Sequence, residues 1–163
     1  MRIAMTMRRK VIYAALLVMA MALWCFTHSD RAKVRRVFAD VERLAAKESG
    51  ESVMECAAKS RSLACQFKDG CEIVDLGPGL NAVYSRDDIS GGLLAFRSSA
   101  TRIAVQFRKL EISFNGGIAR VEGLVDYTGT EATWPRYEPK AKQFLAHLEK
   151  IDGQWLISRI KVP

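Results

Sequence analysis

Histidine and cysteine are scarce in this chain, which has two histidines and four cysteines among 163 residues. Cys56, Cys65 and Cys71 are spaced nine and six residues apart, so the CxxC pairs typical of zinc sites are missing. The glycines of "SGGLL", residues 90–94, lack the lysine that follows them in a phosphate-binding loop. No pair of residues suits acid–base catalysis. The sequence therefore predicts no metal, no cofactor and no catalytic group.

Acidic residues are also absent from the first 29 positions, where Arg2, Arg8, Arg9 and Lys10 supply four of the seven net positive charges. The rest of the chain then carries a surplus of only three. No motif that alternates basic and aromatic residues accompanies this charge. A surplus this small is typical of a solvated surface, and the sequence predicts no nucleic-acid partner.

The basic start is followed by sixteen uncharged, mostly apolar residues at 11–26. A run of this kind is typical of a signal peptide or a membrane anchor, although a comfortable span needs roughly 20 residues. We interpret residues 1–10 as a cytoplasmic leader, 11–28 as a transmembrane anchor in the cell inner membrane, and 30–163 as a domain on the periplasmic or extracytoplasmic side. Cleavage after Ala20-Met21-Ala22, which would release the domain into the periplasm, and a buried core helix are the alternatives.

Apolar spacing in the domain predicts three helices, over 30–49, over 53–67 and from Ser85 to Ile103. Ser85 or Asp87 suits the N-cap of the third helix. A short strand is expected at 71–76, after a turn at Lys68–Gly70.

From Ala104 onward the apolar residues alternate, which is typical of strands. Their phase slips near Arg108–Lys109, and such a slip predicts a β-bulge. Asn115-Gly116 predicts a hairpin turn that pairs Ile112 with Ala119 and Glu111 with Arg120. Asp152-Gly153 predicts a second hairpin.

The second hairpin is apolar on both faces. Leu145, Ile151, Leu156 and Ile160 lie on one face, and Phe144, Leu148, Trp155 and Ile157 lie on the other. A two-sided apolar hairpin is covered on both sides or offers one face to a partner. The second set is therefore our candidate interface.

The order of these elements resembles the nuclear transport factor 2-like family. The likeness covers almost all of residues 31–163 and is carried by "FADVERLAAKESGESVMECAAKSRSLACQF", "SRDDISGGLLAFRSSATRIAVQFRKLEISFNGGIARVEGLVDYTG" and "LEKIDGQWLISRIKV". The resemblance implies an α+β cystatin-like cone, with three helices packed on a strongly curved antiparallel sheet. The family includes ketosteroid isomerases, dehydratases and polyketide cyclases, as well as non-catalytic binding and assembly modules.

Two functional interpretations follow. We favour a membrane-tethered extracytoplasmic binding or assembly module without enzymatic activity, which forms a homodimer or binds an envelope protein. The alternative is a pocket for a small apolar ligand, with isomerase-, dehydratase- or cyclase-like chemistry. Its candidate ligand-binding residues are Tyr84, Tyr127, Trp134 and Tyr137, the last two in a lid loop at 132–139.

An exported domain would allow a Cys65–Cys71 disulfide, with three free thiols as the alternative.

Overall fold

The computed structural model describes residues 29–74, 82–131 and 141–162. The chain separates into two compact units, Met1–Lys33 and Val34–Pro163. The first helix of the described part begins at Asp30 and continues into the second unit, which holds all the other described elements. The expected leader and anchor at 1–28 lie outside the described residues. Within the described ranges, no helix combines the length and the apolar character needed to cross a bilayer.

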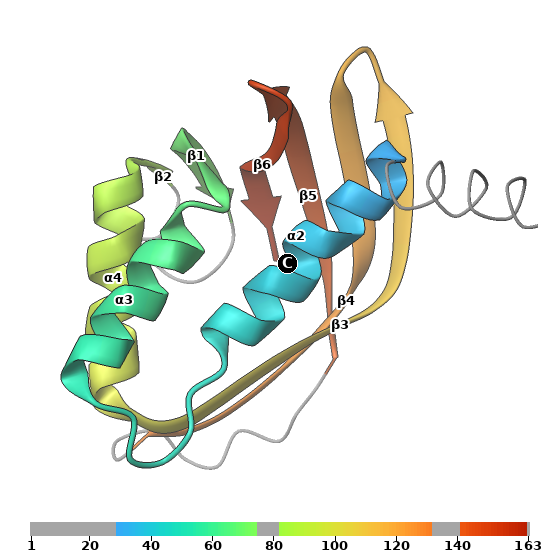
Figure 1. Cartoon of the computed structure of the whole chain (residues 1–163). Coiled ribbons are helices and arrows are strands. Elements are labelled where there is room, and N and C mark those ends of the chain that lie inside the picture. Colours follow the sequence, from blue (N-terminus) through green and yellow to red (C-terminus); the bar gives the residue numbers. More distant parts are fainter. Residues whose placement is uncertain (1–28, 75–81, 132–140, 163) are drawn as a thin grey trace, which may run out of the picture. The chain divides into compact units, whose positions relative to one another are not determined.

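Three helices and six strands make up the described part, which confirms the α+β class (Figure 1). In chain order they are α2 (Asp30–Ala45), α3 (Val53–Ala64), β1 (Phe67–Val74), β2 (Ala82–Tyr84), α4 (Arg86–Ser99), β3 (Ala100–Asn115), β4 (Ile118–Glu131), β5 (Lys142–Ile151) and β6 (Gln154–Lys161). The strands form one sheet in the order β2-β1-β6-β5-β4-β3. The sheet is mixed rather than antiparallel as expected, because β1 pairs in parallel with β6.

The helices begin where the sequence predicts and end earlier. Ser85 caps α4 in a reciprocal capping box with Asp88, and Ser52 caps α3 in the same way with Glu55. The predicted first helix runs to residue 49, but α2 ends at Ala45 because the backbone of Lys47 turns to form two hydrogen bonds with Ile103, of 2.9 and 3.1 Å. β3 also takes the residues from Ala100 to Ile103 that we expected in the third helix.

The turn of the first hairpin lies one residue later than predicted. Its two central residues are Gly116 and Gly117, with φ of 55° and 85°, so Asn115 pairs with Ile118. The whole register is displaced by two residues from the predicted one, and Glu111 faces Glu122 instead of Arg120. Glycine adopts positive φ at less cost than asparagine, which favours the Gly-Gly turn. An even displacement leaves every side chain on its predicted face.

The predicted bulge in β3 is confirmed, and it coincides with a glycine in β4. Pairing passes from Arg108–Leu124 directly to Glu111–Glu122, so two residues of β3 face Gly123 alone. Lys109 in the bulge has a φ of 53°. A Cβ atom on Gly123 would lie 2.9 Å from the carbonyl oxygen of Arg108 and 3.0 Å from the ring of Phe144. The bulge and the missing side chain together allow the bend that both strands show in Figure 1.

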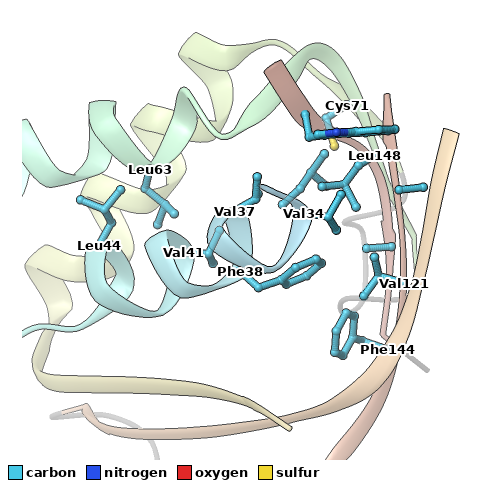
Figure 2. Close-up of a cluster of buried hydrophobic side chains, with 14 of the residues drawn as sticks. Val34, Val37, Phe38, Val41, Leu44, Leu63, Cys71, Val121, Phe144 and Leu148 are labelled. Carbon is cyan, nitrogen blue, oxygen red and sulfur yellow. The ribbon is translucent and has the colours of Figure 1, made fainter. Parts of the chain in front are cut away.

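The core lies between α2 and the concave face of the sheet (Figure 2). Val34 and Phe38 of α2 meet Val121 of β4 and Leu148 of β5 there. All four candidate interface residues belong to this core, which corrects the prediction: the exposed fractions are 3% for Phe144, 0% for Leu148, 5% for Trp155 and 1% for Ile157. Sequence alternation identifies the two faces of a hairpin but cannot tell which face a distant helix will cover.

A second bulge corrects the assignment of Ile160. Pairing between β5 and β6 passes from Leu148–Ile157 to His147–Arg159 and leaves Ser158 outside the paired register. The phase of β6 changes at this point, so Ile160 lies opposite the buried Ala146 and packs against the core.

Replacement of Gly123 with valine should lower the free energy of unfolding by about 1–3 kcal/mol, because the new side chain would press on the backbone of β3 and on Phe144. Gly92→Ala is the matched control. Gly92 lies in the exposed part of α4, where a Cβ atom would have nothing within 4 Å, so alanine should stabilise by about 0.5–1 kcal/mol. Urea unfolding measures both changes. Equal stability of the Gly123→Val variant and the parent would contradict the close approach at the bend.

Candidate functional site

Beyond the core, the concave side of the sheet carries a second group of apolar side chains that are only partly covered. We call this group the concave apolar surface: Leu93 and Phe96 of α4, Val105 and Phe107 of β3, and Val125 and Tyr127 of β4. Val105 pairs with Tyr127, and Phe107 pairs with Val125, so the four strand residues form two adjacent rows. Phe96 is 38% exposed, which is unusual for a phenylalanine turned toward a sheet.

Aromatic contacts join this surface to the core. The ring of Phe107 lies edge-on to Phe38 and to Phe144, with centroid separations of 5.1 Å in both cases. At the other end Phe96 and Tyr127 lie 6.0 Å apart. Edge and tilted contacts at these distances are favourable aromatic geometries. The surface therefore has a well-packed floor at Phe107 and a more exposed rim at Phe96 and Tyr127.

Tyr127 owes its position to a glycine two residues further along β4. A Cβ atom on Gly129 would overlap the Tyr127 hydroxyl oxygen, so the tyrosine side chain lies over Gly129. This places the hydroxyl at the rim of the concave apolar surface. Any larger residue at position 129 would displace it.

The other predicted ligand-binding residues are not brought to this surface. Tyr84 is half-buried in β2, at the sheet edge opposite to β3, where it pairs with Cys71 and packs against the core. Trp134 and Tyr137 lie outside the described residues. Of the four candidates, the structure places only Tyr127 on the concave apolar surface, and its role in binding stays a prediction.

One carboxylate, that of Glu42, lies between α2 and the β3 edge of the sheet. Its Oε1 accepts a hydrogen bond of 2.5 Å from the backbone N–H of Phe107. β3 is an edge strand, and an outward N–H group of such a strand is a liability unless a side chain or a loop satisfies it. We therefore assign Glu42 to the protection of the strand edge and give it no catalytic role.

A buried ion pair lies where the three helices meet. The Arg97 and Glu51 side chains are 1% and 3% exposed, and Nη2 of Arg97 lies 2.6 Å from Oε2 of Glu51. Arg97 also donates to the carbonyl oxygens of Leu44, Ala45 and Ala46, at 2.9, 2.8 and 3.1 Å. These carbonyls end α2, where a cation is favoured by the helix dipole.

Glu51 is held in its charged form by three donors. Burial alone would raise its pKa, but hydrogen bonds from Lys59, Arg97 and Cys56 outweigh this effect, so the pKa lies below its ordinary value of 4.5. Sequence analysis missed this pair, because Arg97 and Glu51 are 46 positions apart and each reads as a solvated charge. No local pattern could have joined them.

The outer face of the described part of the sheet has grooves of a different character, and two of them contain charged pairs. The larger, of about 600 Å³, lies behind the bend and includes Lys109, Lys161 and the facing pair Glu111 and Glu122. The smaller, of about 370 Å³, includes Asp126, whose side chain is only 12% exposed and lies 2.5 Å from Nη2 of Arg108. Asp126 thus lies on the polar face as its alternation indicates, but it is ion-paired instead of solvated. Charged side chains thus line part of each of these two grooves.

The predicted disulfide is not formed, since Cys56, Cys65 and Cys71 are all free thiols. The segment at Lys68–Gly70, expected to be a turn, is part of β1, and it directs Cys71 into the core while Cys65 is exposed. Burial raises the pKa of Cys71 to about 11, with a smaller contribution from Glu72. A thiol of that pKa is unreactive at neutral pH.

No family model matches the sequence, and no curated protein matches it. Solved structures do. A "Putative Scytalone Dehydratase" from Novosphingobium aromaticivorans is 18% identical with a TM-score of 0.65, and the match covers 82% of each chain. A variant of a chain named Rd1NTF2_05 is 18% identical with a TM-score of 0.54, over 83% of this chain and 100% of that one.

A protein of unknown function with a cystatin-like fold from Nostoc punctiforme is 13% identical with a TM-score of 0.57, over 82% of this chain and 89% of that one. At such low identities the likeness concerns the fold alone. The described part of the chain thus has the nuclear transport factor 2-like fold, also called cystatin-like, that the element order predicted.

Glu51→Gln should lower the free energy of unfolding at pH 7 by about 3–5 kcal/mol, since it leaves the Arg97 charge buried without its partner. The parent should also lose stability as the pH falls through the depressed pKa of Glu51, because the unfolded chain binds this proton at a higher pH. The variant should show a weaker loss in the same acid range. Denaturant unfolding between pH 7 and pH 3 measures both effects.

Glu149→Gln is the control for this prediction. Glu149 pairs with Lys68 at 2.7 Å, but both side chains are about one-third exposed, so its removal should cost at most about 1 kcal/mol. Equal losses in the two variants would mean that the buried pair has no special weight.

Proposed function

We propose that this domain binds a small apolar molecule on the concave apolar surface. The observation that carries the proposal is the partial exposure of Phe96, Val105 and Tyr127 on the side of the sheet where α2 and α4 pack. Neighbouring apolar side chains that stay partly exposed are typical of a binding surface. Protein contact through the second hairpin loses its basis, because Trp155 and its three companions are core residues.

The structural neighbours support the same choice. One of them carries the name of a putative scytalone dehydratase, which fits a domain that takes up a small molecule. A shared fold does not transfer a reaction or a substrate, so the proposal for this chain is limited to binding. Glu42 is occupied by the strand edge, and Arg97 by the ends of the helices. Within the described ranges we identify no group that could act as an acid or a base on the ligand.

Two roles follow for the residues of the site. Phe96 and Val105 supply contact area from opposite sides, one from α4 and the other from β3. The Tyr127 hydroxyl, held over Gly129, supplies a polar contact at the rim. A ligand that fits is flat, mostly apolar and has one polar group at its edge.

Phe96→Ser and Val105→Asn should each weaken binding of such a ligand at least about tenfold, which corresponds to about 1.4 kcal/mol of lost apolar contact. The probe is 2-naphthol, titrated into the full chain in detergent by calorimetry. Tyr127→Phe should weaken 2-naphthol more than naphthalene, because it removes the hydroxyl and keeps the ring that contacts Phe96.

Val83→Ser serves as the control. Val83 is 67% exposed on β2, at the opposite edge of the sheet, and its loss should not change the affinity. The proposal is wrong if the parent takes up neither probe, or if Phe96→Ser and Val83→Ser bind equally well.

The membrane anchor at 11–28 and the extracytoplasmic position of the domain also remain proposals. They rest on the basic leader before the uncharged run. Alkaline phosphatase fused after Pro163 should be active in a bacterial host, since the enzyme matures only outside the cytoplasm. An inactive fusion, together with a fluorescent fusion at the same position that is bright in the cytoplasm, would refute this topology. A homodimer or an envelope protein partner stays a prediction without an assigned surface.

A further inference from the structure

One end of the Val34–Pro163 unit exposes large apolar side chains at the β3–β4 turn. Phe114 is 43% exposed and Ile118 is 45% exposed, on either side of Gly116-Gly117. Most residues of this size in the unit are buried in the core or partly covered against it. Arg35 and Arg36 of α2 are also exposed. We call these four residues the hairpin end.

Contacts between α2 and β3 place the four residues at the same end. Lys47 of the chain after α2 bonds to Ile103, and Glu42 in α2 bonds to Phe107. The helix therefore runs antiparallel to the strand, and its earlier residues lie toward the Phe114 end. Figure 1 shows the β3–β4 turn at the end of the unit where α2 begins.

Helix stability does not account for the arginines. Arg31, Lys33, Arg35 and Arg36 occupy the first two turns of α2, and Asp30 is the only acidic residue of its first turn. The helix dipole acts within the first turn, so it gives no reason for the two exposed arginines of the second turn, Arg35 and Arg36. Two adjacent exposed cations at this end of the unit are complementary in charge to an anionic partner.

The short connection between the uncharged run and α2 indicates that a membrane surface is within reach of the start of α2. The uncharged run ends at Phe26 and α2 begins at Asp30, so only three residues lie between them. Even a fully extended connection of that size spans only about 14 Å. If the run is embedded in a bilayer, the start of α2 lies close to the layer of lipid headgroups, which is several ångströms thick on each side.

We propose that the hairpin end rests on a membrane surface that carries anionic lipid headgroups. Arg35 and Arg36 bind the headgroups, and the tip of the hairpin enters the interfacial layer end-on, with the exposed parts of Phe114 and Ile118 on its two faces. Basic residues near such a surface and apolar side chains at its boundary both add to binding. This inference rests on the anchor at 11–28 and is independent of the proposed ligand.

The test uses the full chain in lipid nanodiscs that contain a photoactivatable diazirine phospholipid. One set contains phosphatidylcholine alone, and the other contains 30% phosphatidylglycerol. After illumination, mass spectrometry locates the labelled peptides. We expect label on the peptide with Phe114 and Ile118, increased about threefold or more by phosphatidylglycerol.

Val53 and Met54 supply the internal control. They are 80% and 84% exposed and so more accessible than the hairpin end. They follow Glu48, which pairs with Arg102 at the start of β3, so they lie at the far end of that strand from the turn. They should receive little label in either nanodisc.

Two variants test the charges. Arg35→Gln combined with Arg36→Gln should abolish the threefold increase with phosphatidylglycerol. Arg43→Gln, later on the same helix in an exposed pair with Asp40, should leave it unchanged.

Label on 11–26 without label on the turn overturns the proposal and keeps the anchor. Label on neither overturns both, and equal label on Met54 shows non-specific exposure and overturns the proposal as well. None of these outcomes bears on 2-naphthol binding.

Discussion

The buried contact of Arg97 with Glu51 and the carbonyls of α2 fixes how the helices meet. The last carbonyls of a helix have no partner within it, and Arg97 of α4 supplies donors to those of α2. Glu51, just before α3, neutralises the arginine. Lys47 donates to the carbonyl oxygen of Arg97 and, at 2.7 Å, to that of Ala100, where β3 begins. One cluster thus sets the ends of two helices, the start of a third and the entry into the longest strand.

The course of β3 then determines where the interior is filled and where it stays open. The strand leaves this cluster as a sheet edge. Lys47, just after α2, holds it at Ile103, and Glu42 of α2 holds it at Phe107; the strand then bends where its bulge faces Gly123. Beyond the bend, Val34 and Phe38 of α2 are fully buried in the core with Ile112 of β3. Before the bend, Val105 and its neighbours remain half-covered. The bulge thus lies between the covered part of β3 around Ile112 and the half-covered part around Val105.

Features encoded within a short stretch could be predicted from the sequence. The capped start of α4, the phase slip at Arg108–Lys109 and the Asp152-Gly153 turn each depend on neighbouring residues, and the order of elements was enough to indicate the fold. The first hairpin was displaced because "NGG" offers two turns that preserve the same alternation. The prediction of the candidate interface was wrong for a different reason. Burial of Trp155 depends on α2, a helix more than a hundred residues away in the sequence.

The two proposed surfaces lie far apart along the same strands, which limits how a ligand could arrive. Ile118 begins β4 at the hairpin end, and Tyr127 lies nine residues further on, at the rim of the concave apolar surface. At about 3.3 Å per residue the separation along the strand is roughly 30 Å, comparable to the hydrocarbon thickness of a bilayer. With the hairpin end on the headgroups, the rim between Phe96 and Tyr127 would stand well above the membrane. An apolar ligand would then have to reach it through water or from a carrier, which favours a molecule with some polar character over a lipid drawn directly from the bilayer.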